Sequence, residues 1–338
     1  MIRAALAAGL LLFAACPAAA RPDPALQTVL ATFEKDEHPD LRGAIVLRDG
    51  KIVAEHYYNG ETADSLHDIR SAGKSVTALV VGIAIDRGKI HNVGDRIDTY
   101  LPELKGSAIG DVPLRDILTM RSGLAAFDED PASPGNEDKL DLAPDPVAFL
   151  RAVPRADPPG TRYRYNSLTA WVAGAVVARA TGGTMADFAG AQLFRPLGIT
   201  RWQWSSDVAG YTKGQGNLSL RLRDFASIGE MVRNDGLYHG RRVISAGWIA
   251  AMLAPKQSIA DSDPYADGYG YFWYSRVQHI AGRAVPVMFA SGNGGNKIYV
   301  VPSRHLVVAI TSSAYGKGYG QRRSQAILQA ILAADLKP

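Results

Sequence analysis

The two ends of the chain carry strand patterns and the middle carries helix patterns, and this arrangement constrains the fold most strongly. Near the start, residues 43–48 and 51–55 are apolar runs joined by Asp49-Gly50, a dipeptide typical of a tight hairpin because both turn positions require positive φ. Near the other end, residues 269–277, 285–290, 297–301 and 306–311 are predicted strands, and residues 321–333 form a predicted helix. One sheet assembled from both chain ends accounts for this pattern.

The middle of the chain is helical by the same criteria. Apolar periodicity predicts long helices over 71–87 and 167–180, and shorter ones over 114–120, 185–193, 222–232 and 246–253. We therefore expect an α/β (α+β) fold with a sheet domain from 21–75 plus 255–338 and an inserted, mostly helical domain over 76–254. Residues 123–146, rich in Asp, Glu, Pro and Gly, are predicted to be a long loop of functional or mobile character.

The first twenty residues are typical of a secretory signal peptide. Arg3 precedes an apolar stretch over 4–15, and Ala18-Ala19-Ala20 is an A-x-A cleavage site. Cleavage there gives a mature chain that begins at Arg21 and is exported, periplasmic or secreted. The alternative is a lipoprotein anchored through Cys16, the single cysteine, in the box 13–16. No later stretch is long and apolar enough to predict a transmembrane helix.

Charge and motif content narrow the function classes. The formal net charge of +4 is spread along the chain without a basic run, which argues against a nucleic-acid or acidic-membrane role. The seven histidines lack metal-ligand spacing, and H-E-x-x-H, phosphate-loop and G-x-S-x-G patterns are absent from the sequence. We predict no metal and no cofactor, and a small molecule as the partner.

Ser71-Ala72-Gly73-Lys74 opens the first long helix. Spacing of three residues puts the Ser hydroxyl and the Lys amine on one face, close enough for proton transfer. The following helix is apolar on nearly every side and must be buried, so Lys74 is not expected to be a free surface lysine. Burial and the positive helix N-terminus are expected to lower the pKa of Lys74. A Ser cap followed by a surface Lys is the structural alternative.

Five segments together carry a resemblance to a known family. They are Ser71-x-x-Lys74, the L-T-M-R-S-G-L run at 118–124, the Y-N-S run at 165–167, the G-N-L-S-L…R-D-F-A element at 216–226 and the S-G-N-G-G-N run at 291–296. In this order they resemble the penicillin-recognising serine hydrolases, in particular the class C β-lactamase-like esterases and amidases of the 6-aminohexanoate-dimer hydrolase branch. The resemblance covers the whole mature chain and implies a β-lactamase/transpeptidase-like antiparallel sheet.

The resemblance also implies roles for individual residues. Ser71 is the nucleophile that forms an acyl-enzyme, Lys74 and Tyr165 move the protons, and the backbone N–H groups of Ser71 and Asn296 form the oxyanion hole. The bare backbone of Gly294 and Gly295 is expected to let an acyl oxygen approach. Around them lie the substrate-binding and supporting positions Asn166, Ser167 and Asn293.

Two departures from the family pattern affect the expected substrate. The family's Y-x-N has Ser167 in its third position and Asn166 in its second, and a Ser hydroxyl can still bond Lys74. Asn293 stands where the family places Lys or His, which argues against strong β-lactamase activity. We expect hydrolysis of an ester or amide, with a β-lactamase or D,D-peptidase as one alternative and a catalytically silent scaffold or ligand sensor as another. No oligomeric state is predicted.

Overall fold

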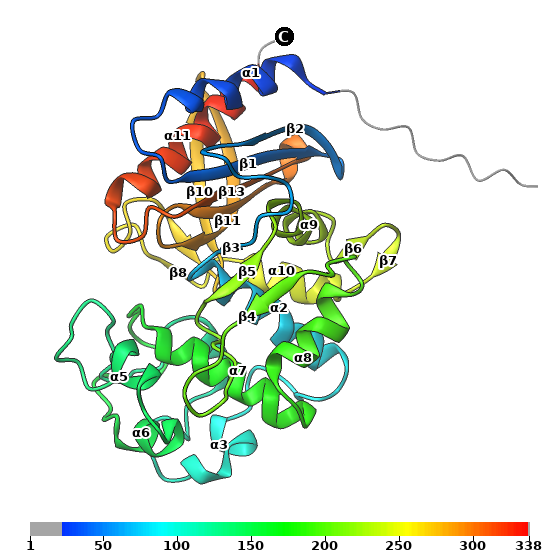
Figure 1. Ribbon diagram of the computed structural model, residues 1–338. Helices are drawn as coiled ribbons and strands as arrows, with labels where there is room; N and C mark the ends of the chain where they lie inside the picture. The colour runs from blue at the N-terminus through cyan, green and yellow to red at the C-terminus, as the bar shows by residue number, and fades with distance from the viewer. Residues whose placement is uncertain (1–21, 337–338) are drawn as a thin grey trace, which may run out of the picture.

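The computed structural model describes residues 22–336 and has an eight-stranded antiparallel sheet at its centre. The strand order is β2-β1-β13-β12-β11-β10-β9-β8, so the N-terminal hairpin lies beside the last strand of the chain (Figure 1). The predicted fold class, a sheet from both chain ends flanked by helices, is confirmed. The strands are β1 (Leu41–Arg48), β2 (Lys51–Tyr57), β8 (Gln257–Ser258), β9 (Gly268–Tyr269), β10 (Tyr274–Ile280), β11 (Arg283–Gly292), β12 (Asn296–Val301) and β13 (Leu306–Ser312).

Helices cover both faces of this sheet. The N-terminal helix α1 (Pro24–Thr32) packs against the C-terminal helix α11 (Gly318–Asp335) on one face, and α9 (Leu222–Arg233) lies on the other (Figure 1). Every residue of β12 and β13 is buried as a result, which explains their unbroken apolar runs. Because α9 packs on β12 and β13, it belongs with the sheet, and the expected domain boundary at residue 254 is wrong for this helix.

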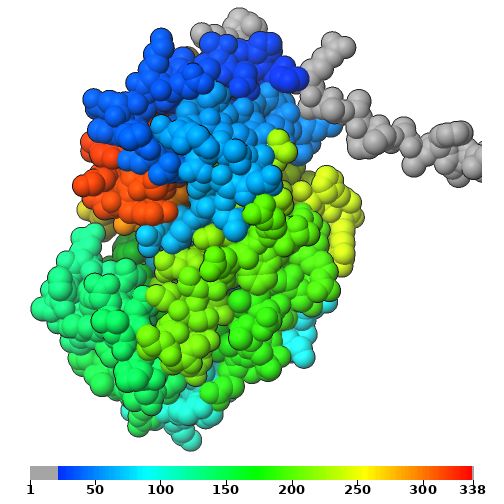
Figure 2. Space-filling view, in the orientation of Figure 1, coloured from blue at the N-terminus to red at the C-terminus, as the bar shows by residue number. Residues whose placement is uncertain are grey.

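The remaining helices form a second layer beside the sheet. The long, mostly apolar and mostly buried helices α2 (Ala72–Asp86) and α7 (Ser167–Thr181) pack against each other at its centre. Figure 2 shows the N- and C-terminal parts together in the upper half and the green middle of the chain in the lower half. The other members are α3 (Ile97–Tyr100), α4 (Leu114–Leu118), α5 (Glu137–Asp141), α6 (Pro146–Ala152), α8 (Met185–Ala189), α10 (Ala246–Leu253) and the short turns η2 (Pro102–Leu104) and η3 (Gly190–Phe194). Two further turns belong to the sheet part: η1 (Phe33–Lys35) follows α1, and η4 (Pro302–Arg304) joins β12 to β13.

Two local predictions are wrong. The predicted strand 269–277 is interrupted after β9 by a turn in which Phe272 has a φ of 54°. Phe272 and Trp273 bury their rings there and bond the first turns of α2 through Ser75. The predicted loop 123–146 is folded, since it contains α5 and a buried Asn136 that ties its parts together. The small sheets β3 (His67–Asp68)–β5 (Leu218–Leu220)–β4 (Trp202–Trp204) and β6 (Leu237–Tyr238)–β7 (Arg241–Arg242) were not predicted.

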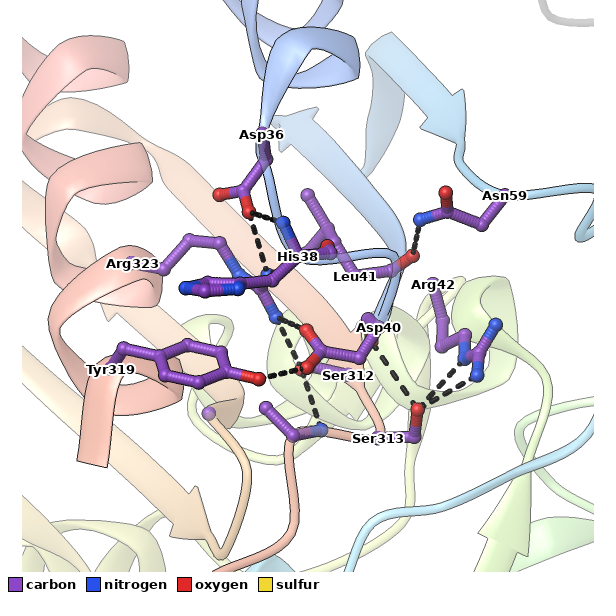
Figure 3. Close-up of polar contacts among 12 residues, drawn as sticks. Asp36, His38, Asp40, Leu41, Arg42, Asn59, Ser312, Ser313, Tyr319 and Arg323 are labelled. Carbon is purple, nitrogen blue, oxygen red and sulfur yellow. Dashed lines mark hydrogen bonds and ion pairs between the residues drawn. The ribbon is translucent and has the colours of Figure 1, made fainter. Parts of the chain in front are cut away.

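A buried ion-pair cluster fastens α11 to the sheet. Arg323 donates to Asp36, to Asp40 and to the Ser312 hydroxyl at 2.8 Å, and Tyr319 bonds the same Asp40 (Figure 3). The Arg323 side chain is only 5% exposed, so removing a partner would leave a buried charge uncompensated. Because Ser312 ends β13, the cluster fixes the strand end that lies beside the β11–β12 turn.

The processing predictions, cleavage after Ala20 or lipidation at Cys16, lie outside the described residues. Within residues 22–336 every helix is too short or too polar to cross a bilayer.

Candidate active site

Ser71 lies at the point where the chain turns from β3 into α2. Arg70, directly before it, has a φ of 52°, a left-handed conformation that is uncommon for a residue with a side chain. Its backbone N–H bonds Asp68 at 2.8 Å, and its guanidinium lies 4.0 Å from the centre of the Tyr315 ring. These contacts hold the sharp turn, which places Ser71 at the N-terminus of a fifteen-residue helix.

Lys74 brings the polar groups of the site together. Its Nζ donates to Ser71 Oγ at 3.1 Å, to Ser167 Oγ at 3.0 Å and to the backbone oxygen of Gln215 at 2.9 Å. The residue is 2% exposed, so the structure excludes the alternative of a surface lysine. The expected contact between Lys74 and the hydroxyl of Ser167 is present. An ammonium has three protons, and all three are used here.

The pKa of Lys74 shifts in the direction opposite to the prediction. Burial lowers the pKa of this amine, but its interactions with Tyr165, Glu137 and Asp128 outweigh burial and raise the pKa above its ordinary value. Lys74 is therefore an ammonium in the resting site. The prediction was wrong because the carboxylates come from the segment 123–146, whose position beside α2 is set by tertiary packing.

Tyr165 lies next to Lys74 and also lines a cavity. The Lys74 Nζ lies 5.0 Å from the centre of the Tyr165 ring. The cavity has a volume of about 520 Å³ and mixed character, and it is also bounded by Phe127, Glu129, Arg162, Tyr163, Arg164, Ser262, Asp263 and Tyr274. A small molecule in this cavity would therefore contact the phenol that faces the Ser71–Lys74 pair.

The end of β11 lies directly against the start of α2. A side chain at Gly292 would put its Cβ 2.0 Å from the backbone oxygen of Ile69 and 3.1 Å from the nitrogen of Ala72. Only glycine allows this approach. Within residues 22–336, the backbone N–H groups of Ser71 and of Asn293 donate no hydrogen bond. Two unused donors thus flank the nucleophile, one on each element.

The side chain of Asn296 has a structural role in the β11–β12 turn. It is fully buried in β12, and its amide bonds the backbone of Asn293 and of Ser312 at 2.9 Å each. These bonds hold the β11–β12 turn from behind. The backbone N–H of Asn296 stays a predicted oxyanion donor, and the N–H of Asn293, which donates no hydrogen bond within residues 22–336, is a second candidate.

The predicted site residues Asn293, Gly294 and Gly295 lie in the turn between β11 and β12. The exposed Asn293 side chain accepts the N–H of Gly316 at 2.8 Å, so it belongs to a surface turn and does not take the place of a site cation. Gly294 and Gly295 have φ values of 86° and 92°, which explains the glycines. A Cβ at Gly295 would lie 2.3 Å from the oxygen of Gly320, so the close neighbour is α11 and not a substrate oxygen.

Three further residues complete the site, and only one of them was predicted. Asn166 caps α7, because its Oδ1 accepts the N–H of Thr169 at 3.0 Å. Asp128 accepts the N–H of Ser167 at 2.6 Å, and burial, with the neighbouring Glu137, raises its pKa to about 6. Gln215 supplies the third acceptor for Lys74. No local pattern marks Asp128 or Gln215, because each acts on a residue distant in sequence.

Comparison with known proteins agrees with this geometry. A sequence profile of the Beta-lactamase family matches residues 34–332. A 6-aminohexanoate-dimer hydrolase from Paenarthrobacter ureafaciens is 27% identical over 283 residues, which cover 80% of this chain and 71% of that protein. Two solved structures share the fold. One is a penicillin-binding protein homologue from Caulobacter crescentus (TM-score 0.75, 19% identity, 93% and 98% covered) and the other a family VIII carboxylesterase (TM-score 0.71, 20% identity, 92% and 99% covered).

The chain therefore belongs to the Beta-lactamase family, and it is a hydrolase similar in sequence to 6-aminohexanoate-dimer hydrolase. No group of three or more metal-ligating side chains is gathered anywhere in residues 22–336.

Proposed function

We propose that this protein hydrolyses an ester or amide of a small molecule through an acyl-enzyme on Ser71. The observation that carries the proposal is the buried Lys74 ammonium bonded to Ser71 Oγ at 3.1 Å, with Tyr165 next to Lys74 and lining the cavity. A serine hydroxyl is a weak nucleophile and needs such an adjacent charge and base. The role of a silent scaffold accounts for none of these contacts.

The proposed reaction has two halves. In the first, Ser71 Oγ forms a bond to the acyl carbon, Tyr165 takes the hydroxyl proton, and the proton passes to the leaving alcohol or amine as its bond to the acyl carbon breaks. In the second, water attacks the acyl-enzyme and gives up a proton by the same route, releasing the acid and restoring Ser71. The N–H groups of Ser71 and Asn293 are the proposed donors to the oxyanion in both halves.

The residues that line the cavity favour a neutral substrate over a charged one. Phe127, Tyr163 and Tyr274 give it aromatic surface, and its charged residues, Arg162 and Arg164 against Glu129 and Asp263, are balanced. A β-lactamase or D,D-peptidase activity is the second candidate. Arg162 favours it, because this exposed cation has no ion-pair partner in residues 22–336 and could hold a substrate carboxylate.

A labelling experiment tests the nucleophile. The wild-type protein should react with a fluorophosphonate probe on the Ser71 peptide only, and Ser71→Ala should lose both the label and turnover. Ser303→Ala, in an exposed turn, serves as the control and should keep both. A label that persists in Ser71→Ala refutes the nucleophile, and an unlabelled wild type without turnover favours the scaffold.

A substrate panel separates the two candidate activities. We expect kcat/KM for p-nitrophenyl butyrate to exceed that for nitrocefin or for a D-amino-acid amide. If nitrocefin is the better substrate and Arg162→Gln removes that advantage, the second candidate replaces the first.

A further inference from the structure

The three acceptors of Lys74 determine where its ammonium lies. One is Ser71, at the start of its own helix, and the other two, Ser167 and Gln215, come from distant segments. Gln215 is 141 positions away in the sequence. The position of the ammonium therefore depends on how precisely Ser167 and Gln215 are held.

Each of these distant acceptors is held in turn by a carboxylate of the segment 128–141. Asp128 Oδ2 accepts the backbone N–H of Ser167 at 2.6 Å. Asp141 Oδ1 accepts the side-chain amide of Gln215 at 2.9 Å, and its Oδ2 pairs with Lys213 at 2.6 Å. Both anchors are charge-assisted hydrogen bonds, the stronger kind.

The segment between the two carboxylates is internally fixed. Asn136, only 3% exposed, donates to the backbone oxygens of Asp128 at 3.0 Å and Asp130 at 3.2 Å. Its Oδ1 caps α5 by accepting the N–H of Asp138 at 3.0 Å. Asp141 ends this short helix, so the two carboxylates are held relative to one another.

We propose that Asp128 and Asp141 form a two-point clamp that positions the catalytic Lys74, Asp128 through Ser167 and Asp141 through Gln215. The inference rests on the proposed function of Ser71 and Lys74. It makes both carboxylates positioning residues that need not touch the substrate. It also gives the segment 123–146, which the sequence predicted to be a loop of functional or mobile character, a specific function in the proton path.

Charge and geometry make separable contributions at Asp128. The titratable groups that act on the pKa of Lys74 are Tyr165, Glu137 and Asp128, of which the last two are carboxyl groups. A negative charge stabilises the protonated form of any nearby base, so its removal lowers the pKa of that base. Asp128→Asn keeps an acceptor for the Ser167 N–H and loses the charge, whereas Asp128→Ala loses both. The acid limb of the kcat/KM profile should therefore move to lower pH in both variants.

The loss of position should appear in kcat. We expect Asp128→Ala and Asp141→Ala to lower kcat for a neutral p-nitrophenyl ester about ten- to a hundredfold with KM little changed, because small misplacement of a catalytic group costs up to roughly 10²-fold. Asp128→Asn should recover most of the kcat while keeping the shifted acid limb. Asp138→Asn, an exposed carboxylate on the same short helix, should match wild type in both measurements.

The outcomes are distinguishable from failure of the proposed function. Turnover that survives in Ser71→Ala refutes the nucleophile, whatever the clamp variants do. With Ser71→Ala inactive, a kcat within threefold of wild type in both Ala variants overturns the clamp. An unmoved acid limb in Asp128→Asn, a variant of nearly unchanged shape, overturns the role of its charge. Circular dichroism of each variant shows whether a lost kcat reflects unfolding. If an Ala variant is unfolded, the kcat and the acid limb of the near-isosteric Asp128→Asn decide whether Asp128 has the proposed role.

Discussion

Lys297 lies inside the sheet, and no carboxylate among residues 22–336 forms an ion pair with it. Its side chain is 2% exposed on β12, its Nζ donates to Ser291 Oγ at 2.7 Å, and the amine lies 4.8 Å from the centre of the Phe289 ring. Burial lowers the pKa of Lys297 to about 7, and the charge of Asp263 only partly opposes this. An exposed lysine has a pKa of about 10.4.

This difference makes the free energy of unfolding depend on pH. Between pH 7 and about 10.4 the unfolded state binds a proton that the folded state lacks, so stability rises with pH across that window. The full slope is about 1.4 kcal/mol per pH unit. Because the folded amine, with a pKa of about 7, is still half protonated at pH 7, the slope starts at half that value, and the free energy of unfolding rises by about 2 kcal/mol between pH 7 and pH 9. Below pH 7 the full penalty is present, and above about pH 10.4 this contribution vanishes.

Lys297→Met removes the amine and keeps an unbranched chain of similar size. The half-buried Ser291 loses a hydrogen bond worth about 1 kcal/mol. We therefore expect the free energy of unfolding of the variant to exceed that of wild type by about 3 kcal/mol at pH 7. At pH 9 this difference should be smaller by about 2 kcal/mol.

Urea unfolding followed by fluorescence at pH 7, 8 and 9 measures this difference, with the exposed Lys89→Met as the control that should run parallel to wild type. If the free energies of unfolding of wild type and Lys297→Met change with pH in the same way, the reasoning is refuted. That result would mean that the folded protein keeps the amine charged without penalty.

Two further substitutions test the site. Tyr165→Phe keeps the ring and removes the proton carrier, so kcat for an ester with a poor leaving group should fall roughly 10²–10⁴-fold; a fall below about threefold would reduce Tyr165 to a packing residue. Gly292→Ala puts a methyl group 2.0 Å from the backbone oxygen of Ile69, which forces β11 and α2 apart, so kcat/KM should drop at least about tenfold at a stability cost of about 1–3 kcal/mol. Gly247→Ala, whose Cβ meets nothing within 4 Å, should leave kcat/KM and the melting temperature near wild type, and equal losses in the two variants would contradict the packing argument.

The elements that the sequence predicted well are those whose signal is local. The two long helices and the strands β1, β2, β11, β12 and β13 follow from periodicity within each segment. The Asp49-Gly50 turn has positive φ at both residues, as that dipeptide predicts. The predicted strand 269–277 is interrupted at Phe272. The buried aromatic and glycine residues around it resemble a strand in sequence, but the chain turns there and Trp273 bonds Ser75 of α2.

At the site, the sequence determined which residue types are available and the spacing that puts Ser71 and Lys74 on one face of a helix. It also required Lys74 to be buried, because the helix that follows is apolar on all sides. Only the tertiary structure decided what surrounds that lysine. Asp128, Ser167 and Gln215 lie far apart in the chain, and no short-range rule relates them.

The same distinction explains the wrong sign for the pKa of Lys74 and the finding of a second free backbone N–H, at Asn293, that the sequence did not predict. A pKa depends on every charge near a buried atom, and a free N–H depends on which strand end packs against which helix. Both quantities depend on contacts between distant segments. They are set only when Gly292 packs against Ile69 and Asp128 accepts the backbone N–H of Ser167 in α7.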